Sequence, residues 1–104
     1  MQQSSAHADS QTVRAGWYGA GEGLSHHTAN GEVFNPNGRT AAHRTLPFGT
    51  RLEVSYNGRS TIVRVNDRGP LAYTGRSLDL SHGAATELGL AGTGNVAIRV
   101  IDER

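Results

Sequence analysis

The sequence contains no cysteine and no lysine, so all ten of its basic residues are arginine. Without cysteine the chain can form neither a disulfide nor a thiolate metal site. No apolar run approaches the roughly 20 residues that are needed to span a membrane. The arginines never occur side by side and the net charge at pH 7 is only +1, so the basic stripe that tracks nucleic-acid phosphates is missing. These absences argue against a disulfide-stabilised, a membrane-spanning or a nucleic-acid-binding protein.

What the sequence does contain is glycine and short alternating segments. With 104 residues, 14 glycines and 36% hydrophobic residues, it has room for one domain with a single core. No helical pattern runs for more than about ten residues, which is typical of a turn-rich β protein rather than a helix bundle. We therefore expect an all-β fold, in which about six short strands and one short helix form a small closed barrel.

A hairpin gives the clearest local signal in the chain. Residues 51–56 and 59–66 alternate between apolar and polar side chains, and Asn57-Gly58 lies between them. This pattern predicts two antiparallel strands joined by a type I′ turn. The same reasoning predicts further strands at residues 12–18 and 95–101.

Two residues mark the ends of the only convincing helix, which is predicted over 81–88. Ser81 is suited to cap its first turn, and Gly89 is suited to the left-handed conformation that ends a helix. Residues 1–11, by contrast, are polar and without periodicity, and they predict a disordered leader before a domain at 12–104. The leader has neither the cationic start nor the apolar core of a signal peptide, so we expect either a cytoplasmic protein or the mature form of an exported one.

The segment Val63-Arg64-Val65-Asn66-Asp67-Arg68-Gly69-Pro70 predicts a strand that runs into a turn. Alternation places Val63, Val65 and Asp67 on one face, so that the carboxyl lies where an apolar row ends. Such a position would desolvate the acid, as a proton-donating catalyst requires. Alternatively, Asp67 binds backbone amides of the turn that follows, as aspartate often does.

Glu32 and His43 are the polar residues that could act together with Asp67, although both lie far from it in the sequence. Only the fold can bring them together. The alternatives are a solvated loop carboxylate for Glu32 and a partly buried, hydrogen-bonded imidazole for His43. Asp79, which comes just before the predicted helix, favours a capping or turn role. Trp17-Tyr18 predicts either a sugar-stacking platform or core packing.

Three other kinds of site find little support. Among the five histidines only His26 and His27 are close together in the sequence. Adjacent residues in a strand point to opposite faces, so we predict no metal site. A serine nucleophile would need a Gly-x-Ser-x-Gly elbow, which is absent. The glycine-rich residues 19–23 are not followed by the βαβ unit of a nucleotide-binding loop. No cofactor is therefore expected.

Five segments together resemble the RlpA (rare lipoprotein A) family in their order and approximate spacing. They are Trp17-Tyr18-Gly19, Thr28-Ala29-Asn30-Gly31-Glu32, Thr40-Ala41-Ala42-His43-Arg44-Thr45-Leu46-Pro47, Val63-Arg64-Val65-Asn66-Asp67-Arg68-Gly69-Pro70 and Asp79-Leu80-Ser81. Any one of them would be a weak signal, but all five in order are specific and extend over about residues 13 to 101. One departure is His26-His27, which stands where the family commonly has a glycine and a basic residue.

The resemblance implies a fold, an activity and a set of site residues. The fold is a six-stranded double-psi β-barrel, as in expansins and family 45 endoglucanases, and characterised members are endolytic peptidoglycan lytic transglycosylases that act on glycan strands lacking stem peptides. The family's acid falls on Asp67, and its Glu and His fall on Glu32 and His43. The implied substrate contacts are Trp17, Tyr18, Thr28, Asn30, Asn66 and Arg68. A periplasmic or extracellular monomer with peptidoglycan as its partner is expected.

Lytic cleavage of the MurNAc–GlcNAc bond explains why one acid is enough. The C6 hydroxyl of the sugar attacks, and a 1,6-anhydro end forms without water. A single carboxyl can protonate the leaving oxygen and then accept the hydroxyl proton, whereas ordinary glycosidases use two carboxylates. We expect Asp67 to be this acid, with Glu32 and His43 orienting the substrate or tuning proton affinity, but the sequence equally allows Glu32.

Two alternative functions use the same barrel. One is an expansin-like module that binds cell-wall glycan without cleaving it. The other is a water-using glycosidase, in which Asp67 and a second carboxylate act as acid and base. The first alternative belongs to a different functional class, and analysis of the cleavage products separates all three.

Overall fold

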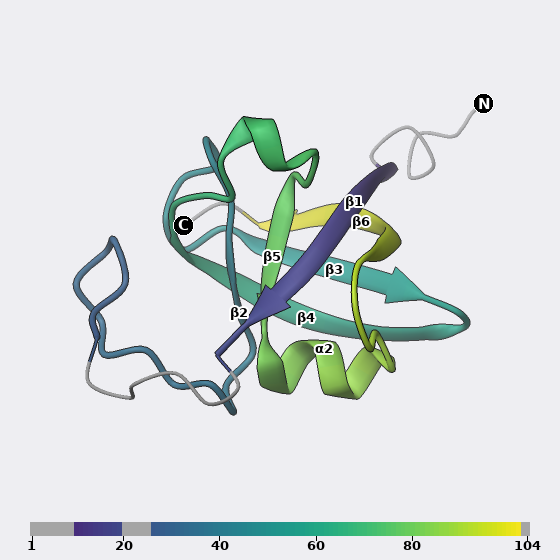
Figure 1. The fold of residues 1–104 in the computed structure, drawn as a ribbon, viewed down its shortest axis with the longest axis horizontal. Helices are drawn as coiled ribbons and strands as arrows, with labels where there is room; N and C mark the ends of the chain where they lie inside the picture. The colour runs from purple at the N-terminus through teal and green to yellow at the C-terminus, as the bar shows by residue number, and fades with distance from the viewer. Residues whose placement is uncertain (1–9, 20–25, 103–104) are drawn as a thin grey trace.

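Six strands close into a barrel in the computed structural model, which describes residues 10–19 and 26–102 (Figure 1). The strands are β1 (Ser10–Tyr18), β2 (Thr40–Ala42), β3 (Arg51–Tyr56), β4 (Arg59–Asp67), β5 (Leu78–Ser81) and β6 (Gly94–Asp102). Their order around the barrel is β1-β5-β2-β4-β3-β6. The helices are the 3₁₀ turn η1 (Ala72–Thr74) and α2 (His82–Leu88). The predicted all-β, six-stranded double-psi β-barrel with one short helix is confirmed.

The predicted hairpin is present as β3 and β4. Tyr56 pairs with Arg59 across the turn, and the two residues between them, Asn57 and Gly58, have φ angles of 51° and 81°. Positive φ at both central residues defines the type I′ turn, whose twist matches that of the flanking strands. Leu52 and Val54 of β3 are fully buried in the barrel core.

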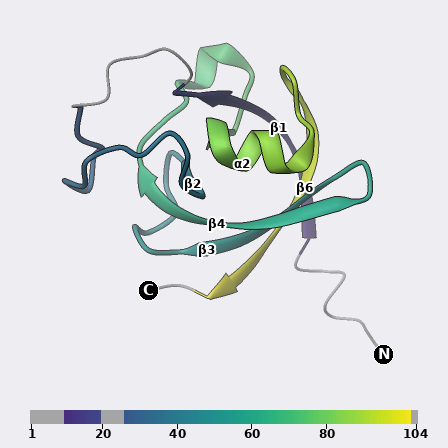
Figure 2. The ribbon, with the colours of Figure 1, turned by 90° about the horizontal axis from the view of Figure 1, so that it is seen from below.

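Helix α2 closes one end of the barrel, and it lies in front of the barrel interior when the molecule is seen from below (Figure 2). The Ser81 hydroxyl accepts the backbone N–H of Ala84, and Gly89 ends the helix with a φ of 76°. Both predicted caps are thus confirmed. Ala85 and Leu88 belong to the same buried core cluster as the strand residues, so the small helix covers the apolar interior of the barrel at this end.

Strand β1 begins at Ser10, two residues before the predicted start, so Ser10 and Gln11 belong to the barrel and pair with β6. The rest of the predicted leader, residues 1–9, lies outside the described residues. Most of the glycine-rich segment 19–23 does so as well. No helix in the described ranges has the length and apolar character needed to cross a membrane.

Candidate active site

Asp67 is the last residue of β4 and is partly exposed. Its Oδ1 accepts the backbone N–H groups of Ala29 and Arg68, each at 2.9 Å, and its Oδ2 accepts the Tyr18 hydroxyl at 3.1 Å. The Arg68 amide belongs to the turn after the strand, so the turn-binding interpretation of Asp67 is correct. Among the described residues, no arginine or histidine forms a salt bridge with this carboxylate.

A bulge in β4 turns Asp67 away from the barrel core. In the parallel pairing of β2 with β4, Ala41 lies opposite Val65 but Ala42 lies opposite Asp67, so Asn66 is an extra residue. Ala41 belongs to the core cluster, and Ala42, the next residue of the strand, faces the other way. Asp67 therefore leaves the apolar face of its strand. The prediction that it shares this face with the preceding valines is wrong, because alternation fails at a bulge.

Glu32 is held by four hydrogen bonds from three side chains. Arg64 donates to both carboxylate oxygens at 2.5 and 3.0 Å, Asn66 donates at 3.0 Å, and Asn30 donates at 3.0 Å. The Arg64 hydrogen bonds, followed by that of Asn66, lower the pKa of Glu32 from 4.5 to about 2. Glu32 is therefore ionised at neutral pH and has no proton to donate.

The loop of residues 28–32 connects the two carboxylates. Its Asn30 backbone N–H donates to the carbonyl of Asn66 at 3.2 Å, and the neighbouring Ala29 N–H is the one that reaches Asp67. Glu32 ties the same loop to β4 through Arg64. The hydrogen bonds of Glu32 thus fix the loop in a position from which the Ala29 N–H donates to Asp67.

Two of the predicted substrate contacts are buried within this loop assembly. Thr28 is only 5% exposed and donates its hydroxyl to Asn30 Oδ1 at 2.6 Å, while Asn66 is 2% exposed and donates to Glu32. The side chain of Asn30 is also engaged within the loop, because it accepts a hydrogen bond from Thr28 and donates one to Glu32. The geometry gives these three side chains the role of shaping the loop.

His43 follows β2 and is joined to Asp67 through the main chain, because its N–H donates to the Asp67 carbonyl at 3.2 Å. The imidazole Nδ1 accepts the backbone N–H groups of Thr45 and Leu46, both at 3.1 Å. Burial, together with the charges of Arg44 and Arg68, lowers the pKa of His43. A nitrogen that accepts two N–H groups carries no proton, so the neutral ring bears its hydrogen on Nε2.

The His43 side chain lines a pocket of about 310 Å³ with Gln11, Thr45, Leu46, Ile98 and Val100. Neither carboxylate is part of this lining. The fold thus brings Glu32 and Asp67 together through one loop, and it brings His43 beside Asp67 through the backbone, with the imidazole turned to its own pocket. The described residues contain no group of three or more His, Asp or Glu side chains placed to hold a metal ion.

Tyr18 and Trp17 are consecutive residues of β1, and their side chains take opposite directions. Tyr18 reaches Asp67, and its ring stacks on Phe34 with centroids 4.8 Å apart and an interplanar angle of 15°. Phe34 in turn stacks on His26 at 4.9 Å. This row of three rings fixes the direction of the Tyr18 hydroxyl.

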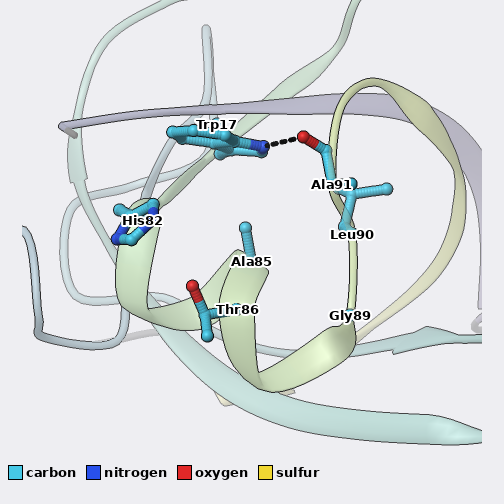
Figure 3. Close-up of a pocket in the computed structure, with 7 residues that line it drawn as sticks. All are labelled: Trp17, His82, Ala85, Thr86, Gly89, Leu90 and Ala91. Atoms are coloured by element: carbon cyan, nitrogen blue, oxygen red, sulfur yellow. Dashed lines mark hydrogen bonds between the residues drawn. The ribbon is translucent and has the colours of Figure 1, made fainter.

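Trp17 lines a different pocket, of about 270 Å³, on the side of α2 (Figure 3). Its Nε1–H donates to the carbonyl of Ala91 at 3.2 Å, and its ring lies 4.9 Å from that of His82 at an angle of 58°. Figure 3 shows a ring of side chains around this pocket, none of them carrying a carboxylate or a guanidinium. Trp17 also packs against the core, so it is apart from the residues around Asp67.

Asp79 is a polar residue whose position the sequence interpretation missed. It lies inside β5, and its Oδ1 accepts a hydrogen bond from Arg76 Nε at 2.9 Å. The residue that caps the helix is Ser81. The capping prediction for Asp79 is therefore wrong. Asp79 pairs with Ala42, which pairs on its other side with Asp67, so the two aspartates belong to one row across three strands. Alternation between two buried leucines was the signal for its outward direction.

The comparisons with known proteins identify the family of the chain. The family model described as lytic transglycolase matches residues 10–100. The probable endolytic peptidoglycan transglycosylase RlpA of Synechocystis is 55% identical over an alignment of 91 residues, and the match covers 84% of this chain and 28% of that protein. The endolytic peptidoglycan transglycosylase RlpA of Vibrio cholerae is 47% identical over an alignment of 95 residues, and the match covers 88% of this chain and 35% of that protein.

Two solved structures share the fold at low sequence identity. The Streptomyces papain inhibitor has a TM-score of 0.70 and 23% identity, and the match covers 89% of this chain and 94% of that one. An expansin of Clavibacter michiganensis has a TM-score of 0.71 and 22% identity, covering 91% of this chain and 52% of that one. The chain spans 28% and 35% of the length of the two curated relatives described above. With a family model matched over nearly its whole length, the chain belongs to the lytic transglycolase family.

Proposed function

We propose that this protein is an endolytic peptidoglycan transglycosylase. It cleaves the bond between MurNAc and GlcNAc within glycan strands and leaves 1,6-anhydroMurNAc ends. The proposed substrate is strands without stem peptides, and the proposed place of action is the periplasm or the cell exterior, where peptidoglycan lies. A monomer without cofactor is sufficient for this chemistry.

The observation that carries the proposal is the difference between the two carboxyl groups. Glu32 is locked by Arg64, Asn66 and Asn30, and its pKa is lowered to about 2, so it is unsuited to deliver a proton. Asp67 has no cation paired with it in the described part of the chain: two backbone N–H groups donate to its Oδ1, and the Tyr18 hydroxyl donates to its Oδ2. This leaves Asp67 as the group that exchanges a proton with the substrate, and it supports a mechanism with a single acid.

The proposed reaction runs through Asp67 in two proton transfers. The Asp67 carboxyl donates its proton to the glycosidic oxygen as the bond from C1 of MurNAc to that oxygen breaks. The C6 hydroxyl of the same MurNAc then bonds to C1, and the Asp67 carboxylate takes the hydroxyl proton. The acid is restored at the end of the cycle, and no water is consumed.

Glu32 and His43 act around this step. Glu32 anchors the 28–32 loop and so places the Ala29 N–H on Asp67. His43, with its hydrogen on Nε2, is a neutral donor that can orient a sugar oxygen. Of the two aromatic side chains, Tyr18 is the one at Asp67, whereas sugar stacking on Trp17 is proposed as a separate contact at the pocket of Figure 3.

Cleavage of purified, amidase-stripped glycan strands in water labelled with heavy oxygen tests this function. Mass spectrometry should find 1,6-anhydroMurNAc ends, each lighter by one water than a reducing end, without heavy oxygen. Reducing ends that carry the label would show hydrolysis, as in a family 45 type of glycosidase. Strand binding without any product would show an expansin-like binding module.

A further inference from the structure

Arg68 directs its guanidinium at the backbone of the loop that holds His43. Its Nη1 donates to the carbonyl of His43 at 3.1 Å and to the carbonyl of Leu46 at 2.8 Å. The guanidinium carbon lies 3.9 Å from the ring centroid of Phe48, which restricts it further. These contacts are all within the protein, and the two hydrogen bonds fix both ends of the loop of residues 43–46 to Arg68.

Arg44 makes the reciprocal connection from the same loop. Its Nη1 donates to the carbonyl of Pro70 at 2.7 Å and to the carbonyl of Arg76 at 3.0 Å. One arginine thus extends from the end of β4 to the loop after β2, and the other extends from that loop back to the segment after β4. The two arginines form a crossed brace between segments 43–46 and 68–76.

The brace acts on the imidazole because it fixes the amides that His43 uses. The His43 Nδ1 accepts the N–H of Leu46, and the carbonyl of that same Leu46 accepts Arg68. A loop fixed at both groups keeps two N–H donors aimed at Nδ1 and leaves Nε2 to carry the hydrogen.

We propose that Arg68, together with Arg44, is a positioning residue that holds His43 in its neutral form with the hydrogen on Nε2. Sequence resemblance had given Arg68 the different role of a substrate contact. The catalytic use of His43 as a hydrogen-bond donor rests on the proposed function. The effect of the two arginines on the protonation of His43 does not depend on that function.

The charges around His43 have the sign that this role requires. Its neighbours on the loop and after β4 are the cations Arg44 and Arg68, while the side chains that line its pocket from β1 and β6 are uncharged. The Asp67 contact is through a main-chain carbonyl. Burial and the two cations lower the pKa of His43, so the neutral ring is kept at pH values where an ordinary histidine begins to gain a proton.

The test is to follow the His43 ring by nitrogen NMR during a pH titration of the full chain without substrate. Arg68→Gln should raise the His43 titration midpoint and weaken the Nε2–H signature, whereas Arg68→Lys, which keeps the charge, should restore most of the midpoint. Arg59→Gln is the matched control, because Arg59 is the first residue of β4 whereas Arg68 follows its last residue, and this variant should leave the ring unchanged. Arg44→Gln should shift the midpoint in the same direction as Arg68→Gln, and it carries the test if Arg68→Gln does not fold.

Kinetics on glycan strands then separate positioning from substrate binding. Loss of positioning should lower kcat by about tenfold with little change in KM. An Arg68→Gln variant that raises KM alone, with the His43 titration and tautomer unchanged, would overturn the proposal and return Arg68 to substrate binding. The NMR result stands by itself: hydrolysis products or no products would refute the proposed function without altering the outcome for the brace.

Discussion

Glu32 belongs to the 28–32 loop and Asp67 accepts a backbone N–H of the same loop, yet the surroundings of the two carboxylates differ in kind. Side chains hold Glu32, among them the guanidinium of Arg64, whereas two backbone amides and a tyrosine hydroxyl hold Asp67. The hydrogen bonds from Arg64, followed by that from Asn66, lower the pKa of Glu32 to about 2, so this carboxylate is charged at neutral pH. In the proposed mechanism the two acids therefore have different roles: Glu32 anchors the loop, and Asp67 exchanges protons with the substrate.

If Asp67 is the single catalytic acid, as proposed above, the difference gives Glu32 a structural role. Without Glu32, the 28–32 loop loses its ion pair to β4, and with it the fixed position of the Ala29 N–H. Removal of either acid should therefore impair cleavage, but for different reasons and by different amounts.

The largest effect is expected for Asp67→Asn, which keeps the shape of the side chain and loses the transferable proton. Loss of general acid–base catalysis is worth roughly 10²- to 10⁴-fold in rate. Circular dichroism and glycan-strand pull-down should be nearly unchanged, while release of 1,6-anhydro products falls to background. Substantial turnover by this variant would remove Asp67 from the acid role.

Glu32→Gln should lower the rate by about tenfold, because the loop loses its charge-assisted hydrogen bonds in a partly exposed position. Glu87→Gln is the matched control. Glu87 pairs with Arg39 and also has its pKa lowered to about 2, but it lies on α2, so this variant should cleave at the wild-type rate. Equal losses in both variants would indicate a general effect of charge removal rather than an effect on the loop.

Tyr18→Phe removes the hydroxyl from Asp67 Oδ2 and leaves the ring stacked on Phe34. A typical hydrogen bond contributes about 1 kcal/mol, so the cleavage rate should fall by about fivefold. Rates at limiting and saturating strand concentrations should show the loss in kcat. A change in KM alone would instead place the hydroxyl on the substrate.

The ion pair of Glu32 should also appear in the acid stability of the fold. A carboxylate whose folded pKa is lowered stabilises the folded state above its ordinary pKa of 4.5, and this contribution is lost as the pH falls from there toward 2. Urea unfolding should therefore show wild type more stable than Glu32→Gln at neutral pH, with the difference disappearing in strong acid. A difference that is constant with pH would show that the charge is not responsible.

The smallest expected signal comes from Trp17, which is the only tryptophan in the chain and so reports on its pocket alone. If sugar stacks on this ring, titration of glycan strands into Asp67→Asn should change the fluorescence without cleavage. Thr86→Arg, at an exposed pocket position, should abolish that change. Unchanged fluorescence, with strand binding shown by pull-down, would confine the glycan to the side of Tyr18.

Local patterns predicted the elements that are stabilised locally. The hairpin turn of Asn57 and Gly58 and the helix ends at Ser81 and Gly89 each follow from a conformation that a single residue favours. Strands β2 and β5 have only three and four residues, and the sequence patterns did not predict them as strands. Their strand conformation comes from their neighbours in the barrel.

The candidate site was predicted by resemblance and not by local pattern. No spacing rule connects Glu32 to Arg64, and alternation misplaced Asp67 because Asn66 forms a bulge. The brace of Arg44 and Arg68 uses backbone carbonyls as acceptors, which no side-chain motif encodes. Residue types and the resemblance could therefore nominate the acids and suggest different roles for them, whereas the contacts that support this difference come from the fold.

The most direct test of this division is the single-turnover cleavage rate of Asp67→Asn measured beside that of Glu32→Gln on the same amidase-stripped strands. The account predicts that Asp67→Asn is slower than Glu32→Gln by at least about tenfold, since one variant loses the proton and the other loses only its placement. An inactive Glu32→Gln beside an active Asp67→Asn would contradict the account and make Glu32 the acid.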